Sequence, residues 1–446
     1  MFNDAFNNNS RRDFVKNSSL IAGGLIAAPM FTRANYFAGA TDAIKVALVG
    51  CGGRGTGAAM QALLSGQNVK LVAMCDAFAD NIENCHKALM AEATSNGKGI
   101  EKNIDVPADR RFTGFDGYKK AIALADVVIL TTPPGFRPIH FDEAISQNKH
   151  VFMEKPVATD PAGVQKVLAT ALIAKQKKLN VVVGLQRHYQ TSYRELFQNK
   201  DLIGDITSAH AWWNNDGVWV RPRKAGQTEM EYQMRNWYYF NWLCGDHINE
   251  QHIHNLDVIN WFKGGYPVKA QGSGGRQVRN GKENGEIFDH HSVEYTYADG
   301  SILTSQCRHI PGTSSKVDEL FIGTKGKIFC NAAKIVDFKG NTLFQYAKKG
   351  KNLEKDPYQT EHEELFAAIA KGEYKFADAE NGAKSTMTSI LGRMATYSGQ
   401  VIDWDKAINS GIDIHPKVYA WDAPTPTNPG PDGFYPIAVP GVTKYF

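Results

Sequence analysis

The chain has 446 residues, of which 43% are hydrophobic and 22% are charged, a composition that is typical of globular proteins and excludes a disordered or collagen-like chain. Its formal net charge is only +4, which gives no electrostatic case for a nucleic-acid partner. No apolar run reaches the about 20 residues that a membrane-spanning helix needs. At about 150 residues per domain, the length predicts two or three domains.

Residues 1–40 predict an export signal. The segment SRRDFVK (10–16) carries paired arginines, a short apolar run follows at 20–31, and small residues at 38–40 offer a cleavage site. The paired arginines resemble a twin-arginine signal, whose translocon exports folded proteins. We therefore expect a periplasmic protein that spans no membrane once the signal is removed, although an ordinary amphipathic N-terminus remains an alternative. The six cysteines show no zinc or CxxC spacing.

The first segment after residue 40 predicts a nucleotide site. Ile44–Val49 is a buried strand, Gly50, Gly52 and Gly55 form G-x-G-x-x-G, a helix follows to about residue 64, and a second strand ends at Asp76. The glycines allow a tight turn, a close approach to a pyrophosphate and close helix–strand packing. An acid at the end of the second strand binds ribose hydroxyls and repels a 2′-phosphate, so Asp76 favours NAD over NADP.

The same alternation continues along the chain. Ala125–Pro134 and His150–Pro156 are further strands with a helix between them, so residues 41–165 are expected to form a Rossmann domain, a doubly wound parallel α/β sheet. Glu154, Lys155 and Pro156 end the last of these strands, at the edge that faces the ligand crevice in such sheets.

From about residue 206 the pattern changes to strand-like runs separated by turns. Hairpin signals occur at Asp299-Gly300 and at 323–326. Residues 166–403 are therefore expected to form an α+β domain with a large, mostly antiparallel open sheet and two late helices, near 358–370 and 380–400. Residues 404–446 are expected to form a Pro/Gly-rich tail.

The segment from Trp242 to Phe262 is expected to be one helix with a polar stripe. Its positions i, i+3, i+4, i+7, i+10 and i+11 are occupied by His247, Glu250, Gln251, His254, Asp257 and Val258. Three interpretations stay open: a catalytic face, a metal site of His247, Glu250 and His254 with His252 nearby, or a solvated polar face. The histidine spacing matches no known zinc motif, so no metal is expected.

G-x-G-x-x-G, the TTPP strand end and EKP about 100 residues later resemble the glucose–fructose oxidoreductase / inositol 2-dehydrogenase (Gfo/Idh/MocA) family over residues 44–397. The resemblance implies a C-terminal sheet that covers the nicotinamide, a homodimer or homotetramer, and Lys155 near the nicotinamide and substrate. It also matches Glu250, His254 and Asp257 to an acid–His–Asp motif. This chain departs from the family at Glu250, where Asp is usual, and at His252, where Gly is usual, which leaves the substrate and proton path open.

These patterns together predict three groups of site residues. The NAD-binding residues are expected to be Gly50, Gly52, Gly53, Arg54, Gly55, Asp76, Thr131, Pro133, His140, Glu154 and Lys155. The catalytic residues are expected to be Lys155, Glu250 and His254. The substrate-binding candidates are Arg187, His188, Trp237, Tyr238, His247 and Asp257; the two aromatic ones have flat faces that suit sugar rings.

The expected reaction is hydride transfer between a tightly bound NAD and a secondary hydroxyl of a sugar, glycoside or cyclitol. His254 would accept the hydroxyl proton, Lys155 would bind the same oxygen, and Glu250 would orient His254 or bind a neighbouring hydroxyl. Lys155 acting as the base is an internal alternative. An NAD-dependent glycoside hydrolase that oxidises C3 transiently is the main rival, and a non-catalytic NAD- or sugar-binding protein is a further one.

Overall fold

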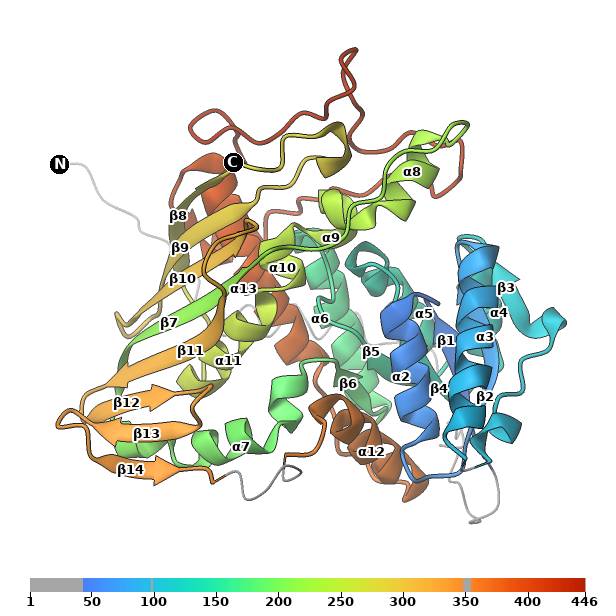
Figure 1. Ribbon diagram of the computed structural model, residues 1–446, viewed down its shortest axis with the longest axis horizontal. Coiled ribbons are helices and arrows are strands. Elements are labelled where there is room, and N and C mark those ends of the chain that lie inside the picture. The colour runs from blue at the N-terminus through green and yellow to red at the C-terminus, as the bar shows by residue number, and fades with distance from the viewer. Residues whose placement is uncertain (1–42, 98, 348–353, 446) are drawn as a thin grey trace, which may run out of the picture. The chain divides into compact units, whose positions relative to one another are not determined.

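The computed structural model describes residues 43–97, 99–347 and 354–445 and contains two β-sheets (Figure 1). All of these residues fall in one compact unit. The export signal expected at 1–40 lies outside the described residues. No helix within the described ranges has the length and apolarity to cross a membrane.

The first sheet has six parallel strands in the order β3-β2-β1-β4-β5-β6. This order is that of a dinucleotide-binding Rossmann sheet. β1 and β4 are almost entirely buried, as expected for parallel strands covered by helices on both faces. The strands are β1 (Ile44–Val49), β2 (Val69–Asp76), β3 (Arg111–Thr113), β4 (Val127–Leu130), β5 (His150–Met153) and β6 (Val181–Val183).

Helices connect these strands in the expected alternation. They are α2 (Gly53–Leu63), α3 (Ala79–Ser95), α4 (Gly117–Ala123), α5 (Arg137–Ser146) and α6 (Pro161–Gln176). The boundary expected at 165/166 falls inside α6, and the parallel sheet continues to β6. The α/β doubly wound fold predicted for this part of the chain is confirmed.

The second sheet has nine strands in the order β14-β13-β12-β11-β7-β10-β9-β8-β15. Among its described strands only the β10–β7 pair is parallel, and the other pairs are antiparallel. Its strands are β7 (Ile206–Asn215), β8 (Lys269–Gly275), β9 (His290–Thr296), β10 (Ile302–His309), β11 (Lys316–Gly323), β12 (Gly326–Phe329), β13 (Lys334–Asp337), β14 (Thr342–Gln345) and β15 (Ile402–Asp403). Burial alternates along β10, so one face of the sheet is packed and the other is open, as predicted.

Helices α11 (Ile253–Lys263) and α13 (Ala379–Ser398) lie on the packed face of the second sheet (Figure 1). Phe262 of α11 stacks on Phe321 of β11 at a centroid distance of 4.6 Å. α13 also packs against α6 of the Rossmann part, so it joins the two sheets through one shared core. The remaining helices are α7 (Thr191–Gln198), α8 (Glu229–Arg235), α9 (Asn241–Cys244), α10 (His247–Glu250), α11 (Ile253–Lys263), α12 (Pro357–Ala370), α13 (Ala379–Ser398) and α14 (Trp404–Ile408).

One prediction about these helices was wrong. The segment from Trp242 to Phe262 is not a single helix but the three helices α9, α10 and α11. The Glu250 carbonyl at the end of α10 accepts a hydrogen bond from the Lys155 ammonium at 2.7 Å, while the His254 amide donates to Gln251 instead. Because a distant lysine takes that carbonyl, the i-to-i+4 bonding of one continuous helix is interrupted.

Candidate active site

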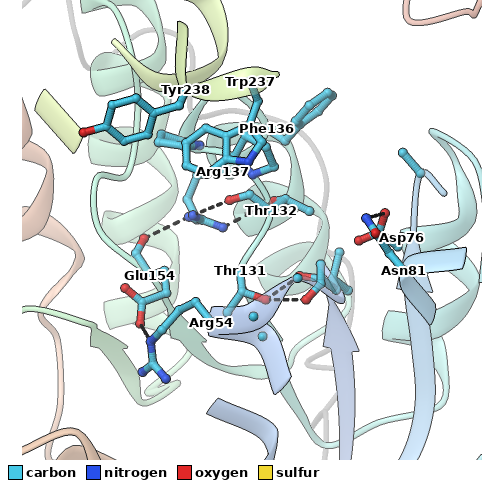
Figure 2. Close-up of a pocket in the computed structure, with 18 of the residues that line it drawn as sticks. Arg54, Asp76, Asn81, Thr131, Thr132, Phe136, Arg137, Glu154, Trp237 and Tyr238 are labelled. Atoms are coloured by element: carbon cyan, nitrogen blue, oxygen red, sulfur yellow. Dashed lines mark hydrogen bonds and ion pairs between the residues drawn. The ribbon is translucent and has the colours of Figure 1, made fainter. Parts of the chain in front are cut away.

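A cavity of about 520 Å³ lies between the carboxyl ends of the parallel strands and the segments that precede and include α10 and α11. Its volume is in the range of small-molecule sites. In Figure 2, Asp76 and Asn81 lie at one end of this pocket, Glu154 and Arg54 lie at the other, and Trp237 and Tyr238 cover it. The pocket therefore has the elongated arrangement, at the sheet's carboxyl edge, that a dinucleotide requires.

The Gly-rich loop forms the floor of the pocket. Gly50 has φ +101°, and a Cβ on Gly55 would lie 2.0 Å from the Gly50 carbonyl oxygen, so both positions require glycine. Among the described residues, a Cβ on Gly52 or Gly53 would meet nothing within 4 Å, and no side chain caps the start of α2. The loop therefore leaves open space in front of free helix N–H groups, which is what a pyrophosphate needs.

Asp76 lies at the end of β2 and is 9% exposed. Its carboxylate accepts hydrogen bonds from the Cys51 amide (2.8 Å), the Phe78 amide (3.0 Å) and the Asn81 side chain (3.0 Å). Burial raises its pKa, and these hydrogen bonds oppose the rise. A carboxylate has about four acceptor positions, so Asp76 is held rigidly and keeps capacity for a ribose hydroxyl.

Arg137 ties together the strand ends that line the pocket, and sequence reasoning missed it. Its guanidinium is 1% exposed and donates to the carbonyls of Glu154 (2.9 Å) and Thr132 (2.7 Å), which follow β5 and β4. Burial lowers its pKa to about 10. No local signal marks this residue, because the carbonyls that it binds become neighbours only when the sheet forms.

The remaining expected cofactor residues also line the pocket, with Thr131 and Pro133 after β4. The Thr131 hydroxyl donates to the Gly50 carbonyl at 2.6 Å and so fixes the turn. His140 is 4% exposed, and burial lowers its pKa to about 3, so it is neutral at pH 7. These contacts shape the pocket wall beside the Gly-rich loop.

Arg54 links the Gly-rich loop to the EKP segment. Its Nε donates to the Glu154 carboxylate at 2.5 Å, and its Nη2 lies 3.3 Å from Glu361 of α12. Its guanidinium also lies 5.1 Å from the ring centroid of Tyr358, another lining residue. Sequence reasoning missed the contribution of α12, which no motif marks.

Lys155 and Glu250 meet at the other end of the pocket from Asp76. The Lys155 ammonium donates to the Glu250 carbonyl at 2.7 Å and lies 3.3 Å from its carboxylate. Glu250 is 9% exposed, and burial raises its pKa while Lys155 opposes the rise. Its second carboxylate oxygen is buried without a hydrogen-bond partner among the described residues, so a substrate hydroxyl could fill that position.

His254 lines the same wall from the first turn of α11. Burial, with the Lys155 charge second, lowers its pKa well below the ordinary value, so the imidazole is neutral at pH 7. Its ring stacks on Trp213 of β7 at a centroid distance of 5.9 Å. In the described part of the chain no hydrogen bond joins His254 to Glu250, so the indole of Trp213, rather than Glu250, orients the ring.

Trp237 and Tyr238, two of the predicted substrate-binding residues, line the pocket. The Tyr238 hydroxyl and the Trp213 indole N–H are both buried without a hydrogen-bond partner among the described residues. Such unpaired buried donors are costly unless a ligand or water completes them. Trp213, Tyr238, Glu250 and His254 all contribute to the lining of this pocket.

The other four substrate-binding candidates lie outside the lining of this pocket. Arg187 is buried against Glu319. His188 pairs with Asp257 at 2.7 Å, and the Asp257 carboxylate also accepts from Ser385 and Asn381. His247 is fully buried beside Asp246. Each of these four side chains therefore has an ion-pair or hydrogen-bond partner elsewhere in the protein.

The three residues considered as a metal site, His247, Glu250 and His254, do not form a ligand cluster in the described ranges. One group that does come together is Asp246, His247 and His291. Both oxygens of Asp246 are already engaged, because they accept from His247, from the Phe288 amide and from the Tyr397 hydroxyl. Asp246 therefore acts as the centre of a buried hydrogen-bond network.

Comparison with known proteins agrees with this geometry. Residues 44–185 match the GFO_IDH_MocA family model, described as "Oxidoreductase family, NAD-binding Rossmann fold". An inositol 2-dehydrogenase of Gluconacetobacter diazotrophicus is 30% identical over 160 residues, which are 35% of this chain and 41% of that relative. The chain thus spans less than half the length of this curated relative.

Solved structures show the same fold over more of the chain. A scyllo-inositol dehydrogenase from Lactobacillus casei, with bound NAD(H) and scyllo-inositol, matches with a TM-score of 0.60 and 18% identity over 82% of this chain and 100% of that one. An aldose-aldose oxidoreductase from Caulobacter crescentus, complexed with glycerol, matches with a TM-score of 0.59 and 14% identity over 81% and 100%. The two-sheet fold is therefore shared with these solved structures, and residues 44–185 match the model of an oxidoreductase family with an NAD-binding Rossmann fold.

Proposed function

We propose that this protein transfers a hydride between NAD and a secondary hydroxyl of a sugar, glycoside or cyclitol. The observation that carries the proposal is that Lys155, Glu250 and His254 share one pocket with the Gly-rich loop and Asp76. Cofactor residues and an acid–base group thus face the same space from opposite ends. The inositol dehydrogenases among the relatives support a polyhydroxylated ring as the substrate.

NAD bound in this pocket would supply the hydride acceptor, and the side chains would manage the proton. Neutral His254 accepts the hydroxyl proton as the C–H bond breaks. The Lys155 ammonium has three N–H donors, of which Glu250 engages two. The third donates to the reacting oxygen and stabilises its developing negative charge.

The groups left without partners would position the rest of the ring. The free carboxylate oxygen of Glu250 accepts from a neighbouring hydroxyl, and the Trp213 N–H and the Tyr238 hydroxyl complete the set. The face of Trp237 offers an apolar surface for ring C–H groups. Holding several hydroxyls at once orients one C–H bond for transfer.

Asp76 supports NAD rather than NADP as the cofactor, because a 2′-phosphate would meet a buried carboxylate. The twin-arginine-like segment supports export to the periplasm. A periplasm has no free NAD pool, so we propose that the folded protein carries tightly bound NAD with it. A homo-oligomeric assembly is part of the same proposal and rests on the family resemblance alone.

The test is mass spectrometry of a panel of free sugars, glycosides and inositols incubated with the purified full-length chain and NAD. A product two mass units lighter than the substrate, with any aglycone still attached, is the expected result. Release of free sugar and aglycone without net NADH would contradict a simple dehydrogenase and identify the redox glycoside hydrolase, which the relatives described above do not support. Bound NAD without any turnover would identify a non-catalytic binding protein.

A further inference from the structure

The end of the pocket beside Asp76 is bordered by a contact from the C-terminal half of the chain. Arg235, the last residue of α8, places its guanidinium against Asp80 in the first turn of α3. The two N–O distances are 2.8 Å and 2.7 Å, so the pair is bidentate. The same guanidinium lies 3.6 Å from the ring centroid of Phe78.

Both Arg235 and Phe78 line the pocket, so this contact belongs to the wall of the nucleotide site. Asp80 is four residues beyond Asp76, the residue that would bind the adenosine ribose. The contact therefore lies beside the part of the pocket where the adenosine half of a dinucleotide would lie. It joins the Rossmann part to α8.

The ion pair between Asp80 and Arg235 is weak enough to break and re-form. The Asp80 side chain is 57% exposed and that of Arg235 is 28% exposed, so solvent screens their attraction and the pair contributes modestly to stability. The guanidinium–ring contact and the bidentate geometry add to it. Such a pair can hold a segment closed for most of the time without fixing it permanently.

The C-terminal tail contacts the same end of the pocket through Trp421. Trp421 packs against Phe78 and Phe115 at centroid distances of 5.1 Å and 4.6 Å. Phe115 also lines the pocket. Residues 409–445 contain no helix or strand, so these ring contacts are among those that anchor the tail to the Rossmann part. Phe78 is therefore held both by Arg235 and by the tail.

We propose that Arg235, Asp80, Phe78 and Trp421 form a latch over the adenosine end of the site and that this latch slows dissociation of the dinucleotide. The inference rests on the proposed NAD site and goes beyond it, because it names residues outside the reaction centre that control cofactor retention. An exported NAD enzyme would need slow dissociation of its cofactor, because it could not replace a lost NAD from its surroundings. Residues that act this way affect the off-rate more than the on-rate.

The experiment measures the dissociation rate of NADH from the full-length chain, by stopped-flow fluorescence with excess NAD as the chase. D80N and R235Q should each raise the off-rate about tenfold, and the double variant should raise it little further, because both remove one contact. Salt at 1 M should raise the off-rate of the unaltered protein and leave that of the variants nearly unchanged. W421A should raise it without changing the salt response.

R223Q is the matched control, since Arg223 pairs with Glu229 at the other end of α8 and does not line the pocket. Its off-rate should stay within twofold of the unaltered protein. Unchanged off-rates in D80N and R235Q, or an equal rise in R223Q together with an equal loss of melting temperature, would overturn the latch. Tighter NADP binding in D80N would overturn the latch in another way, because it would show that the freed Arg235 guanidinium binds the 2′-phosphate. Absence of NADH binding in the unaltered protein would overturn the proposed function itself.

Discussion

Lys155 is positioned by a backbone carbonyl more than by a carboxylate. Its ammonium lies 2.7 Å from the Glu250 carbonyl oxygen and 3.3 Å from the Glu250 carboxylate. The carbonyl is available because α10 ends there, so the break in the helix and the position of the lysine depend on each other. Neutral His254, whose ring stacks on Trp213, completes the proposed reaction centre.

Removing either member of this centre should abolish turnover and spare the nucleotide. K155A and H254A should each lower kcat about 10²- to 10⁴-fold, the usual contribution of a positioned acid or base, while the NAD dissociation constant changes less than threefold. Kinetics together with calorimetric titration of NAD check both parts. H210A is a control of the same residue type on β7 outside the pocket, and loss of NAD binding in K155A and H254A would contradict these roles.

The pH dependence of the reaction should reflect the buried imidazole. The pKa of His254 is lowered well below the ordinary value of about 6.5, and the neutral form is the base. The base therefore stays active as pH falls through 6.5 and is lost only at lower pH. The kcat/KM for sugar oxidation, measured with NAD saturating, should show no acid limb near pH 6.5; a limb at that pH would exclude His254 as the base.

Asp76 should control the choice between the two nicotinamide cofactors. D76N keeps an oxygen acceptor of the same shape and removes the negative charge that would face a 2′-phosphate. We expect NAD affinity to fall about tenfold, since a hydrogen bond to a charged group contributes about 1.5–3 kcal/mol, and NADP affinity to rise. Titration of both cofactors checks this, and an unchanged preference for NAD would assign the selectivity elsewhere.

At the scale of elements, the turn between β1 and α2 contains glycines that serve two different purposes. Gly55 allows α2 to approach the Gly50 carbonyl, and there is no space for a side chain between them. Gly53 begins the same helix and faces open space in the pocket. One glycine therefore serves packing, and the other leaves room for a ligand.

These two glycines make a matched test. G55A should lower the free energy of unfolding by about 3 kcal/mol or more, because its Cβ would lie 2.0 Å from a backbone oxygen. G53A should change stability by less than about 1 kcal/mol, since alanine is the better helix former, yet weaken NAD binding through its methyl group. Urea unfolding and NAD titration separate the outcomes, and equal stability of both variants would contradict this account of the turn.

Across the whole molecule, the buried histidines outnumber the buried acids that offset them. Burial lowers the pKa values of His140 and His252 to about 3 and those of His150 and His247 to about 4. It raises those of Glu286 to about 7 and Asp378 to about 6. Below pH 6.5 the histidines of the unfolded chain take up protons and those of the native state do not, so the free energy of unfolding decreases as the pH is lowered. The buried acids take up protons in the native state first, so they increase the free energy of unfolding over the same change.

The net effect should be a loss of stability between pH 6.5 and 4.5. Each unbalanced proton changes the free energy of unfolding by about 1.4 kcal/mol per pH unit. Burial also lowers the pKa values of His254, His309 and His362 and raises those of Asp76, Glu250, Glu319 and Glu361, so seven histidines against six acids leave about one. Urea midpoints at half-unit pH steps measure the slope. H150Q keeps an acceptor for the Asn180 amide and should reduce the slope by about one proton; stability that is independent of pH here would contradict neutral burial of these histidines.

Much of the fold was predictable because its signals are local. The strand–glycine–helix–strand pattern and Asp76 lie within 33 residues of one another (44–76), and the hairpin glycines mark turns within a few residues. Periodicity and turn chemistry report the backbone geometry of one element at a time. They therefore identified both sheets, the Gly-rich loop and the position of Lys155 at a strand end.

The tertiary structure decided which polar groups share a pocket. Arg187, His188, His247 and Asp257 were predicted to bind substrate, yet they pair with other residues of the protein outside the pocket lining. Arg137, the stacking of Trp213 on His254 and the pairing of Arg235 with Asp80 each join residues that no periodicity relates. Residue types and spacing thus determined the fold class and the nucleotide loop, whereas the partners of buried charges depended on packing between distant segments, because a buried polar group must be satisfied by whichever segment the fold brings beside it.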